Sequence, residues 1–398
     1  MNLQLCKRLI LNAVRNTPKP FNNHCPSSHV LFYSTSELKP TTETNRIFDL
    51  LRNHGIAPEA VSSAASVLSE LKNPEKCDSV LSFLKENGFS KTHLEKLVNS
   101  RPRVLAASLD NTIKPKFQIL QYLGISAPDI ANIITLDPLV LFRSVDNRVV
   151  PSIMVLKDIL GSISEVAKLL TKPACSLFLR NDLEKNLLPN IKILRSCGVS
   201  TDRIIRTMFM SPRFVLSRPE KMQEWIGMAD KLGCDRNSLM FIYAVRTLGS
   251  MSSATWEVKW DLFRNMGIPE DKMLWMFQKK PQAFAVSDRK IKEVVKVLLD
   301  TGKYDVEYIT DEPDVFLCSV EKRLKPRLRV LDILESKDLL KQRPRLSTVY
   351  KSSNELFVKW FVFPNLDKDP EIKLLYENAF AKVISKPKSS VSSEDIED

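Results

Sequence analysis

Arginine and lysine side chains recur at matched places along this chain, and they are the residues best suited to do chemistry. Arg103, Arg213 and Arg345 each follow a proline directly. Arg143, Arg180 and Arg218 come five to seven residues after such a proline. Because a guanidinium donates two hydrogen bonds at once to a phosphate, a recurring set of arginines predicts contact with a polyanion.

Further cations fall at or near the start of the helix expected after each of these prolines. The full set of candidate nucleic-acid-binding residues is Arg103, Lys114, Lys116, Arg143, Arg148, Arg180, Lys185, Arg213, Arg218, Arg289, Lys325 and Arg345. For any one of them the alternative is an ordinary solvated charge. Their recurrence favours a shared basic groove, which would contact phosphates and supply affinity and salt dependence but little sequence choice.

No catalytic or metal-binding pattern accompanies these cations. Only His54 and His93 remain after residue 36, and the chain has no HExxH motif and no glycine-rich phosphate loop. Its seven cysteines form no CxxC pair. We therefore expect no enzyme activity, no cofactor and no metal, and we expect the later cysteines to be small buried thiols in a reducing compartment: Cys175, Cys197, Cys234 and Cys318.

The elements that must position the cations form a repeat. Its marker is a glycine that recurs every 33 to 37 residues, at positions 55, 88, 124, 161, 198, 233, 267 and 302. A proline comes fourteen residues later at 102, 138, 212 and 281, and slightly early at 173 and 313; a second proline lies at 115, 151, 189 and 326. Thr247 replaces the first proline once, and Glu335 stands where the next glycine is due.

Each unit therefore reads as a helix, a proline-marked turn and a second helix that ends at the glycine. A period near 35 residues predicts an all-α superhelical solenoid of stacked helical hairpins. We expect this solenoid to span residues 37–365 as one elongated domain, with the aromatic segment 355–363 capping its end. Residues 366–398 are expected to hold the end of a helix and a disordered tail. The tryptophans on helical stripes are expected in the core: Trp225, Trp256, Trp260 and Trp275.

Residues 1–36 have the composition of an organellar transit peptide. They carry Lys7, Arg8, Arg15 and Lys19 and no acidic residue, and they lack the long apolar run of a secretory signal. We predict a mitochondrial location, with the chloroplast as the alternative. The net charge of the whole chain is +12, which favours a polyanionic partner but is also compatible with a protein that is merely soluble. No apolar run is long enough to predict a membrane span.

The repeat resembles that of the mitochondrial transcription termination factor (mTERF) family. The likeness rests on Arg101-Pro102-Arg103-Val104-Leu105, on Lys114-Pro115-Lys116-Phe117 and on Leu123-Gly124-Ile125-Ser126, and it recurs at Asp137-Pro138-Leu139-Val140-Leu141 and Ser211-Pro212-Arg213-Phe214. It covers roughly residues 50–365, and the proline density and leader look like the plant branch. The resemblance implies two α-helices and a short 3₁₀ turn in each repeat, and an organellar protein that binds nucleic acid.

The sequence is compatible with three alternative functions. The first is binding of double-stranded DNA in organellar transcription or its termination. The second is binding of organellar RNA in intron splicing or processing. The third is a solenoid that holds a peptide or helix of another protein, for which binding should be insensitive to salt. A pentatricopeptide array has a similar period, but a proline in mid-repeat does not suit its uninterrupted helices.

Overall fold

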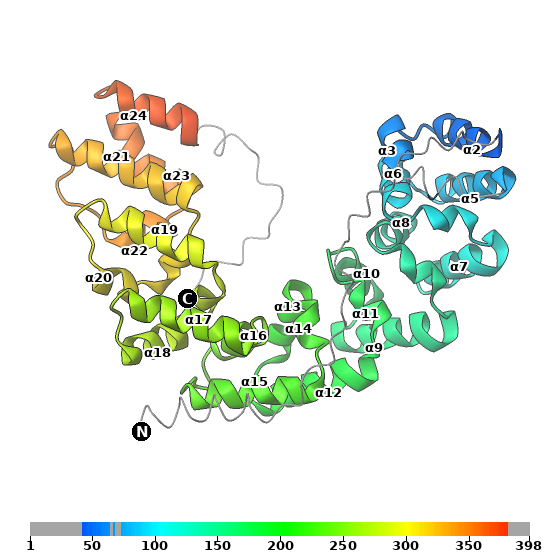
Figure 1. Ribbon diagram of the computed structural model, residues 1–398, viewed down its shortest axis with the longest axis horizontal. Helices are drawn as coiled ribbons and strands as arrows, with labels where there is room; N and C mark the ends of the chain where they lie inside the picture. The colour runs from blue at the N-terminus through cyan, green and yellow to red at the C-terminus, as the bar shows by residue number, and fades with distance from the viewer. Residues whose placement is uncertain (1–41, 64–66, 68–72, 381–398) are drawn as a thin grey trace, which may run out of the picture. The chain divides into compact units, whose positions relative to one another are not determined.

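The computed structural model describes residues 42–63, 67 and 73–380. Their regular structure is helical and includes no strand, which confirms the all-α class. The chain divides into two compact units at residues 224 and 225. We call the described residues up to 224 the N-terminal unit and residues 225–380 the C-terminal unit. In each unit, helices that are consecutive in sequence pack as hairpins (Figure 1).

The N-terminal unit holds α2 (Thr42–Asn53), α3 (Pro58–Ser63), α5 (Pro74–Glu86), α6 (Lys91–Ser100), η1 (Pro102–Ala106), η2 (Leu109–Ile113), α7 (Lys114–Tyr122), α8 (Ala127–Leu136), η3 (Pro138–Phe142), η4 (Val145–Val149), α9 (Val150–Leu160), α10 (Ile163–Leu170), α11 (Leu177–Arg180), η5 (Leu183–Leu187), α12 (Leu188–Ser196), α13 (Thr201–Met210) and α14 (Pro212–Val215). Helix α15 (Pro219–Lys231) crosses from this unit into the next.

The C-terminal unit continues with α16 (Phe241–Gly249), α17 (Ser253–Asn265), α18 (Glu270–Lys279), η6 (Pro281–Ala285), α19 (Asp288–Leu299), α20 (Val306–Asp311), η7 (Pro313–Leu317), η8 (Val320–Leu324), α21 (Lys325–Ser336), α22 (Leu346–Lys351), α23 (Asn354–Phe357), η9 (Val358–Val362), η10 (Phe363–Asn365), α24 (Pro370–Leu375) and η11 (Tyr376–Phe380).

One repeat, from α8 to α9, shows why the sequence folds this way. Helix α8 ends at Leu136 with Asp137 as its C-cap, and Pro138 begins the 3₁₀ turn η3, where its missing N–H is no loss. Val140 and Leu141 of this turn are fully buried and anchor it to the core. Short proline turns of this kind recur as the 3₁₀ segments η1, η6 and η7, which confirms the expected turn, whereas α14 is a single α-helical turn.

A π-helical turn precedes the second helix in several repeats, at η2, η4, η5 and η8. In η4 the Val149 N–H donates to the Ser144 carbonyl five residues back, at 3.1 Å, and the Ser144 hydroxyl accepts the Asn147 N–H at 3.2 Å. This wider turn joins directly onto α9, so it carries the chain from the 3₁₀ turn into the second helix. The spacing of prolines and glycines gave no indication of it.

The eight marker glycines all adopt positive φ angles, from 65° at Gly302 to 89° at Gly124, which confirms their place past a helix end. Glu335, which stands where the next glycine is due, does not adopt a positive φ angle. It is Asp338, with a φ of 56°, that takes the left-handed position after α21, and its N–H donates to the Glu335 carbonyl. Aspartate tolerates this conformation better than most residues, because its short side chain bonds locally.

Thr247 marks a real change in the repeat. Helix α16 continues through Thr247 to Gly249, and a short link leads directly into α17, so the turn expected after a proline is missing here. A Cβ atom on Gly249 would lie 2.8 Å from the Trp225 ring, which explains why a glycine occurs inside this helix.

Of the four tryptophans expected in the core, only one is buried. Trp256 is buried and packs against Phe277 and Phe284, whereas Trp225 and Trp260 are half-buried. Trp275 is 37 % exposed and lies between Lys272 and Lys279, so its assignment to the core was wrong. The four cysteines expected in the core are buried.

The aromatic segment near the C-terminus packs onto the solenoid. Phe357, Val358 and Val362 are fully buried, and the segment that contains them contacts α21. The predicted transit peptide, residues 1–36, and the predicted disordered tail from Lys386 lie outside the described residues.

Candidate nucleic-acid interface

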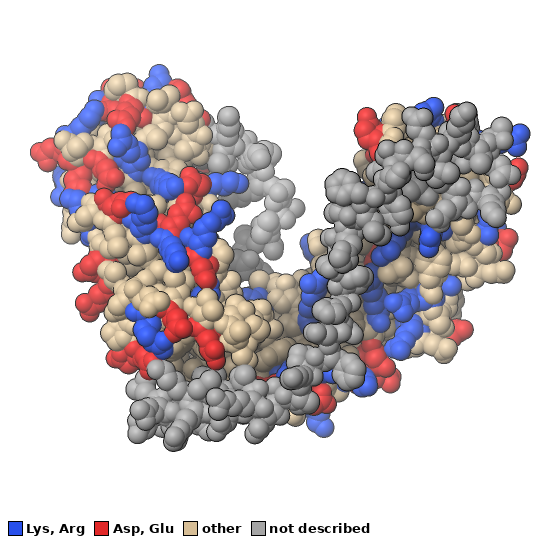
Figure 2. Space-filling view, viewed as in Figure 1, with Lys and Arg blue, Asp and Glu red and all other residues tan. Residues whose placement is uncertain are grey.

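Positive charge is concentrated in one stretch of the N-terminal unit. Residues 101–218 hold 17 Lys and Arg against 9 Asp and Glu, whereas residues 225–380 hold 26 against 23. On the face shown in Figure 2, the C-terminal unit shows basic and acidic side chains interleaved, whereas basic side chains gather over the middle of the N-terminal unit. The surplus that could attract a polyanion therefore lies mainly in residues 101–218.

Three predicted arginines of the N-terminal unit are the strongest candidates. Arg213 and Arg218 are exposed on and after the turn α14, and Arg143 is half-buried at the end of η3. Within the described residues, none of the three has an acidic partner. Buried apolar neighbours, such as Leu141 and Phe214, anchor these turns to the core. Arg103, exposed on η1, occupies the equivalent place but does make a contact within the chain.

Arg180 has a structural role that its sequence position did not reveal. Its guanidinium donates two hydrogen bonds to Asp137, at 2.6 and 2.8 Å, and this aspartate is only 2 % exposed. The hydrogen bond to Asp137 raises the pKa of Arg180, so the guanidinium stays charged. Asp137 also accepts the Leu139 N–H of η3 at 3.3 Å. The pair thus ties α11 to the turn one repeat earlier, and we leave Arg180 out of the proposed interface.

The cations at the start of the second helices differ in their surroundings. Lys114 pairs with Asp110 at 2.7 Å, and Arg148 pairs with Asp182 at 3.5 Å. Lys185 is exposed and, within the described chain, has no acidic partner. Lys116 is buried, and this burial lowers its pKa. Of this group, Lys185 is the cation best placed to meet an external phosphate.

The predicted residues of the C-terminal unit lie among acids. Lys325 pairs with both Glu293 and Glu321. Arg289 is exposed beside an open groove of about 500 Å³ that Glu293 and Glu321 also line. Arg345 is exposed, and the described residues offer it no acidic partner.

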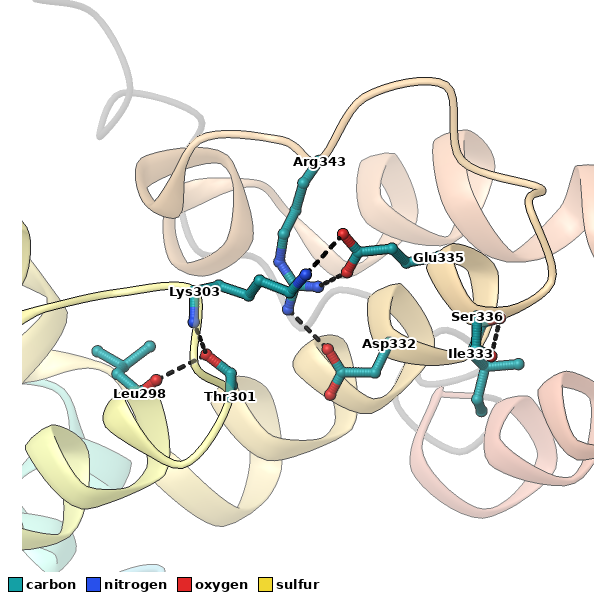
Figure 3. Close-up of polar contacts among 8 residues, drawn as sticks. All are labelled: Leu298, Thr301, Lys303, Asp332, Ile333, Glu335, Ser336 and Arg343. Atoms are coloured by element: carbon teal, nitrogen blue, oxygen red, sulfur yellow. Dashed lines mark hydrogen bonds and ion pairs between the residues drawn. The ribbon is translucent and has the colours of Figure 1, made fainter.

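In one network of ion pairs in the C-terminal unit, basic side chains are paired with nearby carboxylates. The Arg343 guanidinium points between two carboxylates of α21, at 2.6 Å from Glu335 and 2.7 Å from Asp332 (Figure 3). Lys303 reaches Glu335 as well, at 3.0 Å. The hydrogen bond from Lys303, aided by Arg343, holds the pKa of Glu335 below its usual range.

Sequence reasoning missed a second group of basic residues in the N-terminal unit. They lie on α12 and α13, are exposed or half-exposed, and find no acidic partner in the described part of the chain: Lys192, Arg195, Arg203 and Arg206. They do not follow a turn proline, so their repeat position carried no signal. Only the absence of an ion pair among the described residues distinguishes them.

Metal sites and membrane spans are both absent from the part of the chain that the structure describes. Its residues include no group of three or more His, Cys, Asp or Glu side chains that could bind a metal ion. None of the helices among them is both long enough and apolar enough to cross a membrane.

Comparison with known proteins places the chain in a family. The family model mTERF matches residues 81–307 and again residues 247–358, so the two matches together cover most of the chain. No curated protein matches it. The family indicates an organellar nucleic-acid-binding role, without separating DNA from RNA, and this agrees with the unpaired arginines on the helical turns. By its helical repeats and by this match, the chain belongs to the mTERF family.

Proposed function

We propose that this protein binds double-stranded DNA in mitochondria and regulates transcription or its termination. The observation that carries the proposal is the trio Arg143, Arg213 and Arg218, which lack acidic partners among the described residues and recur on proline turns. Such arginines contact phosphates, which give affinity and set the position of the protein on the duplex but do not read its sequence. A protein held on duplex DNA in this way can obstruct a polymerase or recruit other factors. No catalytic step is assigned to the protein.

One observation favours RNA as the second candidate ligand, in organellar intron splicing or processing. Phe142, directly before Arg143, is 50 % exposed at the end of η3. An exposed aromatic ring beside an arginine suits stacking on an unpaired base, which RNA loops offer and an intact duplex does not.

The test compares binding of a duplex and of single-stranded RNA of the same sequence by fluorescence anisotropy, over a range of salt concentrations. The triple variant Arg143→Gln, Arg213→Gln, Arg218→Gln should bind about tenfold more weakly, because three charged contacts of about 0.5 kcal/mol each sum to about 1.5 kcal/mol. Its plot of log affinity for duplex against log salt should be less steep by about 3.

The matched control removes the same net charge from exposed positions of the C-terminal unit, in the variant Lys231→Gln, Lys359→Gln, Lys373→Gln. It should keep nearly all of the affinity. Equal losses of affinity in the two triple variants would refute the interface. Wild-type affinity that does not change with salt concentration would instead support a protein-interaction solenoid. A preference for RNA that Phe142→Ala removes would select the second candidate.

A further inference from the structure

A cavity of about 370 Å³ opens in the C-terminal unit, away from the residues that carry the proposed function. Its polar wall consists of Lys280, Asp314, Arg323 and Lys351. Each comes from a different segment: Lys280 follows α18, Asp314 lies in η7, Arg323 lies in η8 and Lys351 ends α22. Packing of successive repeats therefore brings these side chains together.

The cavity carries a surplus of positive charge. Asp314 is its one lining carboxylate, and it is shared between Lys280 at 2.6 Å and Lys351 at 3.3 Å. Burial acts to raise the pKa of Asp314, but the hydrogen bonds and charges of the two lysines outweigh it, so the pKa lies below its usual range. One ionised carboxylate thus faces three cations. Glu312 does not line the cavity; its carboxylate accepts the hydroxyl of Tyr350, which does, at 2.7 Å.

The arginine of the cavity is held in place by a backbone acceptor. One Nη atom of Arg323 donates to the Tyr350 carbonyl at 3.1 Å, and its side chain is half-buried. Arg327 is fully buried and does not line the cavity; burial, and to a lesser extent the charge of Arg323, lowers its pKa to about 10, so it is still charged at neutral pH. A guanidinium that is already ordered loses little conformational entropy when it binds an anion.

The shape of the cavity suits more than a bare ion. Leu317, which is 39 % exposed, and Cys318 supply an apolar wall beside the cations. The volume falls within the range of about 300–1,000 Å³ that is typical of small-molecule sites. The occupant should therefore combine an anionic group with an organic part.

We infer that this cavity binds a terminal phosphate group attached to an organic moiety. The three cations and one carboxylate of the cavity leave a net charge of about +2, and a phosphate monoester carries close to two negative charges at neutral pH. Its oxygens can accept two parallel hydrogen bonds from the guanidinium of Arg323. Two sources share this chemistry, a free nucleotide and the phosphorylated end of a nucleic-acid strand. The inference stands whether or not the arginines of the N-terminal unit bind nucleic acid.

The experiment is isothermal titration of the full chain with three probes: inorganic phosphate, adenosine monophosphate, and a duplex with or without 5′-phosphates. Lys351→Gln removes a cation that is 56 % exposed, so it should leave the fold intact while weakening binding of the phosphorylated probe about tenfold. Lys359→Gln makes the same change at an exposed position outside the cavity and should bind like the wild type.

Mass spectrometry of lysine acetylation gives a readout that needs no variant. A bound phosphate should slow the labelling of Lys280 and Lys351 severalfold relative to Lys359. Protection by adenosine monophosphate identifies a free nucleotide as the ligand, and protection only by the 5′-phosphorylated duplex identifies a strand end. Equal labelling with every probe, or protection by the unphosphorylated duplex alone, overturns the inference. Failure of the proposed function would show separately, in the triple arginine variant.

Discussion

At the scale of single residues, arginines at equivalent positions in different repeats have different roles. Arg143 and Arg180 lie at similar distances from their turn prolines, yet Arg180 is held by a buried aspartate and Arg143 is not. The partner of Arg180 is 43 residues away, about one repeat earlier. Repeat spacing could therefore predict where arginines occur, but it could not predict which of them are neutralised by the neighbouring repeat.

We expect Arg180→Ala to lower the free energy of unfolding by about 3 kcal/mol, because it leaves the buried Asp137 charged and unpaired. Urea denaturation measures this. The control is Arg148→Ala, which breaks the pair with Asp182 whose side chains are 45 % and 46 % exposed, and which should cost less than about 1 kcal/mol. Equal costs for the two variants would contradict the structural role of Arg180.

At the scale of elements, the helix ends were the most predictable feature. Only a residue that tolerates positive φ fits past such an end, so the glycines marked the period and eight of them were placed correctly. The position of Asp338 past a helix end could not be predicted, because aspartate is common and its presence does not indicate a positive φ angle. The π-helical turns could not be predicted for a related reason. Their cap residues, such as Ser144 and Asp182, are equally suited to the start of an ordinary α-helix.

Two glycines offer a clean test of this interpretation. Gly161 has a φ of 87°, and a Cβ atom added there would meet no other atom within 4 Å, so Gly161→Ala should cost about 1 kcal/mol through backbone strain alone. Gly227 is equally uncrowded but lies within α15, so Gly227→Ala should stabilise by about 0.5–1 kcal/mol. Chemical denaturation compares the two, and a shift in the same direction would contradict the assigned helix end.

At the scale of the whole molecule, the fold class followed from the period, but the distribution of charge did not. A net charge of +12 gives no indication of where the surplus lies. In the C-terminal unit, contacts such as Lys325 with Glu293, 32 residues apart, match cations to acids one repeat away. Such pairing depends on the register between repeats, which only the packed structure reveals.

The proposed mitochondrial location is a prediction about the leader. Residues 1–36 fused to a fluorescent protein should carry it into mitochondria, because a basic, acid-free leader suits import there. Replacing its four basic residues with glutamine should leave the fusion outside the organelle. Accumulation in chloroplasts would instead select the alternative location.

The buried Arg327 also determines how far the chain can be shortened. Its guanidinium donates to the Val349 and Ser352 carbonyls at 2.8 and 2.9 Å and to the Asn354 side chain at 2.7 Å, and it lies 4.8 Å from the centre of the Phe357 ring. In a polypeptide that ends before Val349, the Arg327 guanidinium would lose all of these hydrogen-bond acceptors and its contact with the Phe357 ring. The smallest autonomous fragment containing α21 must therefore extend through Phe357.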